Sequence, residues 1–203
     1  MSARTWLPFA LTEVALCLSP GPAVLLVVSR ALALGTRASI WSNLGILAGN
    51  AMYFALTAAG LGVVLLASHE LFTIVKWTGA AYLIWLGIAA LRGRGRHAPA
   101  AVPAPGRAFA SGFVLQAANP KALVFFAALL PQFIDPTGPI GAQVALLGIT
   151  SMVIEFLVLL GYGLLAARMG MLSARPRFAR LADRVAGALL IAAGVTTAAI
   201  RKA

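Results

Sequence analysis

The sequence predicts an all-α integral membrane protein, with six transmembrane helices arranged as two inverted three-helix repeats in which helices 1 and 4 are broken. The first observation is composition: 61% of the 203 residues are hydrophobic, only 10% are charged, and the mean hydropathy is +0.94. A soluble domain carries about 25% charged residues. The second is that the apolar residues form stretches of roughly 20, enough to cross a bilayer. The predicted spans are Leu7–Val28, Ile40–Leu66, Leu71–Leu91, Phe109–Leu130, Gly141–Ala167 and Leu181–Ile200.

The first and fourth spans each contain a proline motif that should break the helix near the middle of the membrane. These motifs are Ser19-Pro20-Gly21-Pro22 and Ala118-Asn119-Pro120-Lys121. Proline removes an N–H donor and clashes with the preceding turn. A freed backbone group in hydrocarbon costs several kcal/mol, so such a break is tolerated where the backbone lines a cavity. Matching breaks in two halves indicate the central site of a secondary transporter.

Each break should start a new half-helix whose free N–H groups attract a carboxylate. We therefore expect a substrate site that includes Pro20, Gly21, Pro22, Asn119 and Pro120. A structural kink without a ligand is the alternative, and it is less favoured because the motif occurs twice.

Three ionisable residues, Glu13, Lys121 and Glu155, fall inside predicted spans. A charge at the bilayer centre costs on the order of 3 kcal/mol or more and usually faces a cavity or a partner. Lys121 and Glu155 either neutralise each other or receive the carboxylate and ammonium of a zwitterion, and a resting pair that substrate opens would combine both. Glu155 is also the candidate proton carrier, because apolar surroundings favour a protonated carboxyl group. For Glu13, an exit path near the outer face and a hydrogen bond between helices both remain open.

Spans two and five add polar groups. Asn50, Tyr53 and Tyr162 face the same cavity or form interhelical hydrogen bonds. Gly45 and Gly49 form a small-xxx-small face that predicts close helix packing, within or between subunits.

The two halves resemble each other. Residues 79–87 of span three are echoed by residues 187–194 of span six, and the proline motifs have nearly the same offset. Three spans per repeat is an odd number, so the second repeat must enter the membrane in the opposite sense. This divides the chain into a first repeat (1–91), a linker rich in Arg, Gly, Ala and Pro (92–108) and a second repeat (109–203).

Charge predicts the orientation in an inner (plasma) membrane. Arginines cluster in the loops that follow spans one, three and five, and the positive-inside rule makes those loops cytoplasmic. Both termini are therefore expected outside. The net charge of +11 is explained by these loops, so we expect the lipid bilayer and no nucleic acid as partner. His69 and His97 both fall in predicted loops and no metal-ligand cluster is present, so no metal or cofactor is expected.

Several motifs in order along nearly the whole chain resemble the LysE family of amino-acid exporters, in particular its homoserine, homoserine-lactone and threonine efflux branch. These motifs are Leu18–Pro22, Lys76–Gly87, Asn119–Ala122, Pro131–Phe133 and Gly161-Tyr162. The resemblance implies a small inner-membrane exporter of amino acids, driven by proton antiport and compatible with a homo-oligomer. Family members carry Asp or Glu where Glu155 stands. The sequence departs from the family pattern at Glu13, where an uncharged residue is expected.

The predicted mechanism places an amino acid at a midplane site between the repeats. Its carboxylate meets Lys121 and the half-helix ends, and its ammonium meets Glu155. A passive channel or a structural membrane subunit is the alternative. An intramembrane enzyme is less favoured, because no span contains His and neither Glu13 nor Glu155 has a hydrolytic partner set.

Overall fold

The computed structural model describes residues 1–59 and 104–172, together with residues 77, 81, 84, 85, 88, 91, 188, 191 and 195. Apart from those single positions, the predicted third and sixth spans lie outside the described residues. So do both histidines and most of the predicted linker. Every described element is a helix. The inverted repeat stays a prediction, because its second pair of matching segments is not described.

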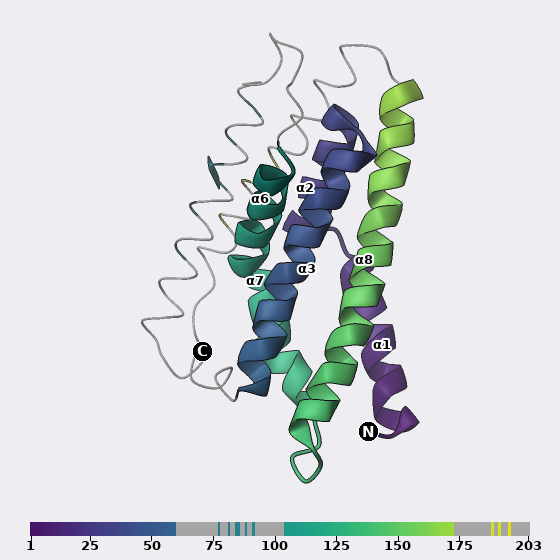
Figure 1. Cartoon of the computed structure of the whole chain (residues 1–203), viewed down its shortest axis with the longest axis vertical. Coiled ribbons are helices and arrows are strands. Elements are labelled where there is room, and N and C mark those ends of the chain that lie inside the picture. Colours follow the sequence, from purple (N-terminus) through teal and green to yellow (C-terminus); the bar gives the residue numbers. More distant parts are fainter. Residues whose placement is uncertain are drawn as a thin grey trace.

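The first predicted span consists of two helices, α1 (Ala3–Leu18) and α2 (Pro22–Leu34), which are bent by 51° at the break between them. The break falls at the first proline motif, as predicted. Pro22 lies in the first turn of α2, where its missing N–H removes no helical hydrogen bond. Both helices pack against α8 (Ile140–Leu172), the long helix that forms the predicted fifth span. In Figure 1, α1 lies near the end that carries the N-terminus and α2 lies toward the opposite end.

The fourth predicted span is also interrupted. It begins with α6 (Pro105–Ala117), slightly before the predicted end of the linker, and stops at the second proline motif. The chain continues as α7 (Pro120–Val124), a π-helical turn η1 (Phe125–Leu129) and a 3₁₀ turn η2 (Leu130–Phe133). The prolines at the starts of α6 and α7 suit the first helical turn, which explains where both helices begin.

Helix α3 (Thr36–Ala58) forms the described part of the second span and packs closely against α6. A Cβ on Gly45 would overlap the carbonyl oxygen of Phe109, and a Cβ on Gly112 would overlap that of Ser42. A Cβ on Gly49 would lie 2.8 Å from the Gln116 Cβ. The predicted small-residue face therefore serves packing within one chain.

Among the described helices, α8 alone is long and apolar enough to cross a bilayer, over Ile140–Met169, and α1 with α2 passes as one bent span. Helix α3 falls short because a row of buried Ser and Asn side chains lowers its hydropathy. The buried polar residues of α3 are Ser39, Ser42, Asn43 and Asn50.

Two buried hydrophobic clusters lie on either side of the cavity that contains the buried ionisable side chains. One contains Phe9, Phe54, Phe125 and Phe126 with neighbouring aliphatic residues. The other joins α2 to α3, α6 and α8 around Val27. Residues of both clusters line one cavity, so the cavity lies between them.

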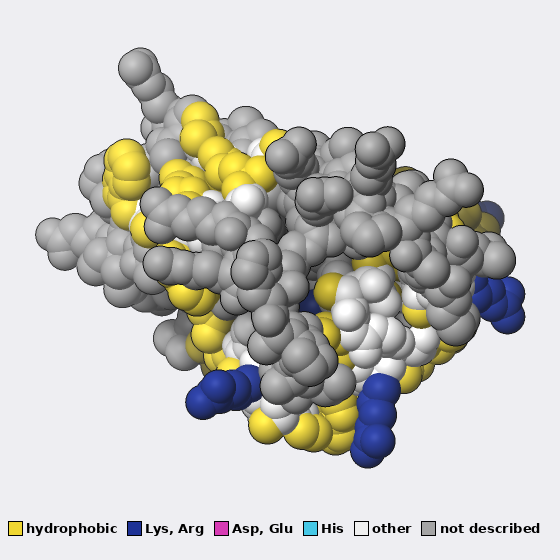
Figure 2. All heavy atoms as spheres, turned by 90° about the horizontal axis from the view of Figure 1, so that it is seen from above, with side chains coloured by type: hydrophobic (Ala, Val, Ile, Leu, Met, Phe, Trp, Pro, Cys, Tyr) yellow, Lys and Arg dark blue, Asp and Glu magenta, His cyan; other side chains and the backbone are white. Residues whose placement is uncertain are grey.

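Arginines gather at one end of the bundle. Arg37 and Arg107 lie in the first turns of α3 and α6, and Arg168 lies near the end of α8. These helix ends lie in the half of the bundle away from the N-terminus (Figure 1). Figure 2 looks onto this end and shows Lys and Arg side chains at its periphery. The charge asymmetry that predicts membrane orientation is therefore present across the described part of the bundle.

Candidate functional site

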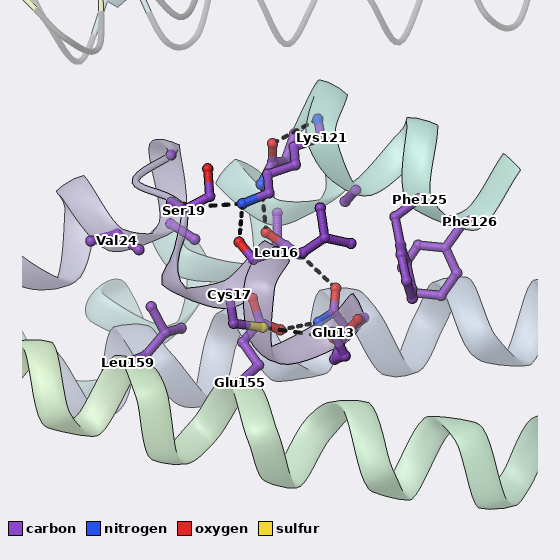
Figure 3. Close-up of a pocket in the computed structure, with 16 residues that line it drawn as sticks. Glu13, Leu16, Cys17, Ser19, Val24, Lys121, Phe125, Phe126, Glu155 and Leu159 are labelled. Atoms are coloured by element: carbon purple, nitrogen blue, oxygen red, sulfur yellow. Dashed lines mark hydrogen bonds between the residues drawn. The ribbon is translucent and has the colours of Figure 1, made fainter. Parts of the chain in front are cut away.

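A cavity of about 60 Å³ lies at the break between α1 and α2. Its polar lining comes from five helices, and its apolar lining comes from both hydrophobic clusters (Figure 3). On a scale where one water needs roughly 10–15 Å³, the cavity has room for several waters or the polar end of a small solute. The polar and ionisable side chains at the cavity are Glu13, Cys17, Asn50, Gln116, Asn119, Lys121 and Glu155.

The broken end of α1 is capped by side chains from other helices. The Lys121 ammonium, on α7, donates to the carbonyl oxygens of Leu16 and Ser19, the latter at 3.0 Å. The Tyr162 hydroxyl, on α8, donates to the carbonyl of Leu18 at 2.9 Å. A helix leaves its last carbonyls unsatisfied and carries partial negative charge there, so a cation is favourable at this position. Lys121 therefore joins the second proline motif to the first.

A chain of amide hydrogen bonds crosses the cavity from α7 to α8. Asn119 Nδ2 donates to Gln116 Oε1 (3.0 Å), Gln116 Nε2 donates to Asn50 Oδ1 (2.5 Å), and Asn50 Nδ2 donates to Glu155 Oε2. The Lys121 backbone N–H donates to Asn119 Oδ1 at 3.1 Å, at the start of the chain. Every donor points toward Glu155, so the carboxylate is the terminal acceptor of a four-helix network.

Lys121 and Glu155 line the same cavity but form no direct ion pair. The resting pair considered from the sequence is therefore not formed in this structure. The physical reason is that each group has closer partners: α1 carbonyls surround the ammonium, and Asn50 holds the carboxylate. Figure 3 shows Lys121 on one side of the α1 end and Glu155 on the other.

Glu13 also lines the cavity, and of the two alternatives considered for it the structure shows the hydrogen bond between helices. Its side chain is only 5% exposed. Glu13 Oε1 accepts from the Ser151 hydroxyl at 2.5 Å and from the Cys17 thiol at 3.7 Å. Two carboxylates and one ammonium therefore line a single small space.

The family described as LysE type translocator matches residues 14–199 of this chain. The chain belongs to the LysE family. Over 206 residues, and 100% of both chains, it is 35% identical to a homoserine/homoserine lactone efflux protein of Salmonella typhimurium. It is also 35% identical over 204 residues, 98% of each chain, to an uncharacterized membrane protein of Vibrio cholerae. A leucine efflux protein of Salmonella typhimurium is 33% identical over 144 residues, 68% of each chain. No solved structure matches the chain.

Family membership confirms the resemblance seen in the sequence and makes this chain a membrane protein of a translocator family, not an enzyme. Within the described residues, no group of three or more His, Cys, Asp and Glu side chains is arranged to hold a metal ion.

The two helix breaks of this LysE family protein differ. At the first, α2 begins without a side-chain cap, and its first backbone hydrogen bond is from the Leu25 N–H to Gly21. The N–H groups of Ala23 and Val24 therefore have no acceptor among the described residues, and both residues line the cavity. At the second break, Asn119 caps α7 through the Lys121 N–H. Open N–H groups were expected at both breaks. At the second break Asn119 accepts the Lys121 N–H, and the Ala122 N–H has no acceptor among the described residues.

The predicted tyrosines lie beside the cavity without lining it. Tyr162 caps α1, and Tyr53 donates to the carbonyl of Ala117 at 2.6 Å, at the end of α6. Of the alternatives for these residues, the structure shows the interhelical hydrogen bond. Pro20 and Pro22 form the break and leave the lining to their neighbours Ser19 and Gly21.

Three residues at the site were missed by sequence reasoning: Cys17, Gln116 and Ser151. Gln116 lies three residues before Asn119, and Ser151 lies one helical turn before Glu155. A polar side chain one turn from a motif residue in an apolar span was the signal that could have identified both.

Proposed function

We propose that this chain is a secondary active exporter of small neutral amino acids of the homoserine or threonine type, and that the cavity at the α1 break is its substrate site. The observation that carries the proposal is the cavity itself, where an ammonium and two carboxylates meet at a broken helix. The names of the relatives, which refer to efflux of homoserine, homoserine lactone and leucine, support the substrate class.

The substrate carboxylate binds Lys121 and the open N–H groups of Ala23 and Val24. The start of a helix of this length attracts anions because its N–H groups and its dipole act together. The substrate ammonium binds Glu155, which Asn50 orients. The helices are broken by Pro20, Pro22 and Pro120. Gly21 leaves space in the cavity wall beside Lys121. Asn119 starts the chain of amide hydrogen bonds by donating to Gln116.

The site must widen to admit a whole amino acid, because about 60 Å³ accommodates only part of one. Lys121 holds α1 against α7, so exchanging the α1 carbonyls for a substrate carboxylate loosens this connection. Rocking of one inverted repeat against the other would then expose the site on the opposite side.

Proton antiport follows from competition at Glu155. The carboxylate binds either a substrate ammonium or a proton. Once it is protonated it is neutral and no longer attracts the ammonium, so the two exclude each other. Substrate leaves outward, a proton takes its place, and the protonated site returns inward. Glu155→Gln should therefore abolish export driven by a pH gradient, and full gradient-driven export by that variant would contradict the role.

The arginine-rich end is the cytoplasmic end, and the N-terminus lies outside. This orientation is supported by Arg37, Arg107 and Arg168 at one end of the bundle. Reporter tags on the two termini test it, because activity of a cytoplasm-dependent reporter at both ends would reverse the topology.

Everted membrane vesicles test the function directly. Labelled homoserine, threonine, leucine and lysine are offered with and without a proton gradient, and vesicles lacking the protein serve as control. We expect saturable uptake of at least one small neutral amino acid, which collapses when a protonophore dissipates the gradient. Non-saturating flux that ignores the gradient would support a passive channel, and no flux for any solute would support a structural subunit.

A further inference from the structure

We propose that Glu13 is a second proton-binding residue, which receives protons from the outer side and passes them across the cavity to Glu155. This inference rests on the proposed export function and adds a step to it. Nothing in the family pattern assigns a role to Glu13, and its involvement follows from where α1 and α8 place it.

The two carboxylates lie at successive levels of α8. Glu13 is bound by Ser151, and Glu155 follows Ser151 by four residues, about 6 Å along the helix axis at 1.5 Å per residue. Helix α8 runs from the end that carries the N-terminus toward the arginine-rich end (Figure 1). In the proposed orientation, Glu13 therefore lies on the outer side of the cavity and Glu155 on the inner side.

The surroundings of Glu13 suit a group that binds and releases a proton. Its hydrogen-bond donors are a hydroxyl and a thiol, and no basic side chain of the described residues forms an ion pair with it. The titratable groups that share its cavity are Cys17 on its own helix, Lys121 from α7 and Glu155 from α8, while α3 and α6 contribute only neutral amides. Keeping a buried carboxylate ionised without an ion pair is costly, so a proton is the partner that neutralises it.

The transfer itself is balanced. Glu13 in its acid form gives one proton to the Glu155 carboxylate, which leaves Glu13 ionised and Glu155 protonated, with no other bond changed. The cavity between them has room for several waters, and a short water chain can carry a proton between groups that do not touch. Glu13 then takes up the next proton from outside.

Purified protein in liposomes provides the first test. For each variant, the gradient-driven transport of labelled homoserine is divided by its homoserine–homoserine exchange without a gradient, because exchange requires no net proton movement. We expect this ratio to fall at least about tenfold in Glu13→Gln, since a proton-transfer group typically contributes a larger factor. Thr150→Ala is the matched control, because Thr150 neighbours Ser151 but contacts Trp6 on the exposed face.

A wild-type ratio in Glu13→Gln, or an equal fall in Thr150→Ala, would overturn the proposal. These outcomes differ from failure of the proposed function, in which the wild-type protein itself would show no gradient-driven transport.

A second test uses the wild-type protein and does not depend on a variant that folds. Dicyclohexylcarbodiimide reacts with protonated carboxyl groups in apolar surroundings, and peptide mass spectrometry locates the adduct. We expect adducts on both Glu13 and Glu155, with labelling of Glu13 decreasing as the pH rises. Labelling of Glu155 without any on Glu13 would overturn the proposal.

Discussion

Replacing Lys121 by Met should separate the role seen in the structure, which is to cap α1, from the proposed role of binding the substrate carboxylate. The structural cost is modest. The Leu16 carbonyl keeps the Ser19 N–H as a partner at 3.2 Å, and Ser19 lines the cavity, where a water can take the place of the ammonium. Loss of the ammonium therefore leaves little backbone unsatisfied, and we expect a destabilisation of about 1–3 kcal/mol.

The expected effect on binding is much larger. Removing one partner of a desolvated, hydrogen-bonded charge pair costs about 2–5 kcal/mol. At about 1.4 kcal/mol for each factor of ten, homoserine should bind Lys121→Met from roughly 30-fold to several thousand-fold more weakly. Equilibrium binding of labelled homoserine to detergent-solubilised protein measures the affinity, and thermal unfolding of the same sample measures the stability.

Tyr162→Phe is the control for this prediction, because it removes the other cap from the same helix end without touching the cavity lining. We expect it to lose about 1 kcal/mol of stability and to keep its affinity for homoserine. If Tyr162→Phe lost affinity as severely as Lys121→Met, the position of the α1 end would control binding, and the assignment of Lys121 to the carboxylate would be refuted. Unchanged affinity in Lys121→Met would refute it equally.

Three further predictions concern helix packing, the chain of amide hydrogen bonds and the access of a thiol reagent to the cavity. Gly45→Ala should destabilise the protein by about 1–3 kcal/mol in thermal unfolding because the new Cβ overlaps α6, whereas Gly161→Ala, with nothing near its Cβ, should gain up to about 1 kcal/mol of helix propensity. Asn50→Leu removes the donor to the Glu155 carboxylate and the acceptor of the Gln116 Nε2 group, so denaturant titration should show a loss of about 2–6 kcal/mol in stability. A loss near zero would contradict the network. Cys17 is the single cysteine and lines the cavity, so a methanethiosulfonate reagent should block transport and saturating homoserine should slow the block. Inhibition that persists in Cys17→Ala would exclude this site as its cause.

The helix breaks, and the ionisable residues near them, were predictable from the sequence because each follows from the chemistry of a residue and its neighbours along the chain. Proline lacks an N–H wherever it lies, and the helices of both spans are interrupted at the motifs that contain Pro20 and Pro120. An ionisable residue in an apolar span has few places to face, which is why Lys121 and Glu155 were expected at one cavity and are found there.

The partners of these residues were not predictable, because they depend on how each helix is rotated and how deeply it sits. Lys121 lies near Glu155, yet only the position of the α1 end decides that the ammonium bonds to carbonyls. Tyr162 could have faced the cavity, and a small rotation of α8 decides that it caps α1. The partner of Glu13 was the hardest to predict, since Ser151 comes from a helix far away in sequence.

The difference between the two breaks bears on how the proposed exporter would move. A break with open N–H groups can bind an anion, whereas a break whose N–H is already capped can serve as a fixed point. At the first break the N–H groups of Ala23 and Val24 are open, whereas at the second Asn119 caps the Lys121 N–H and only that of Ala122 is left open. Lys121 extends from the capped break to the open one, so a substrate carboxylate that draws the ammonium away releases α1 from α7 at the moment the site is filled. Binding and movement would then depend on the same hydrogen bonds, as coupled transport requires, because a carrier that moved without substrate would dissipate the gradient.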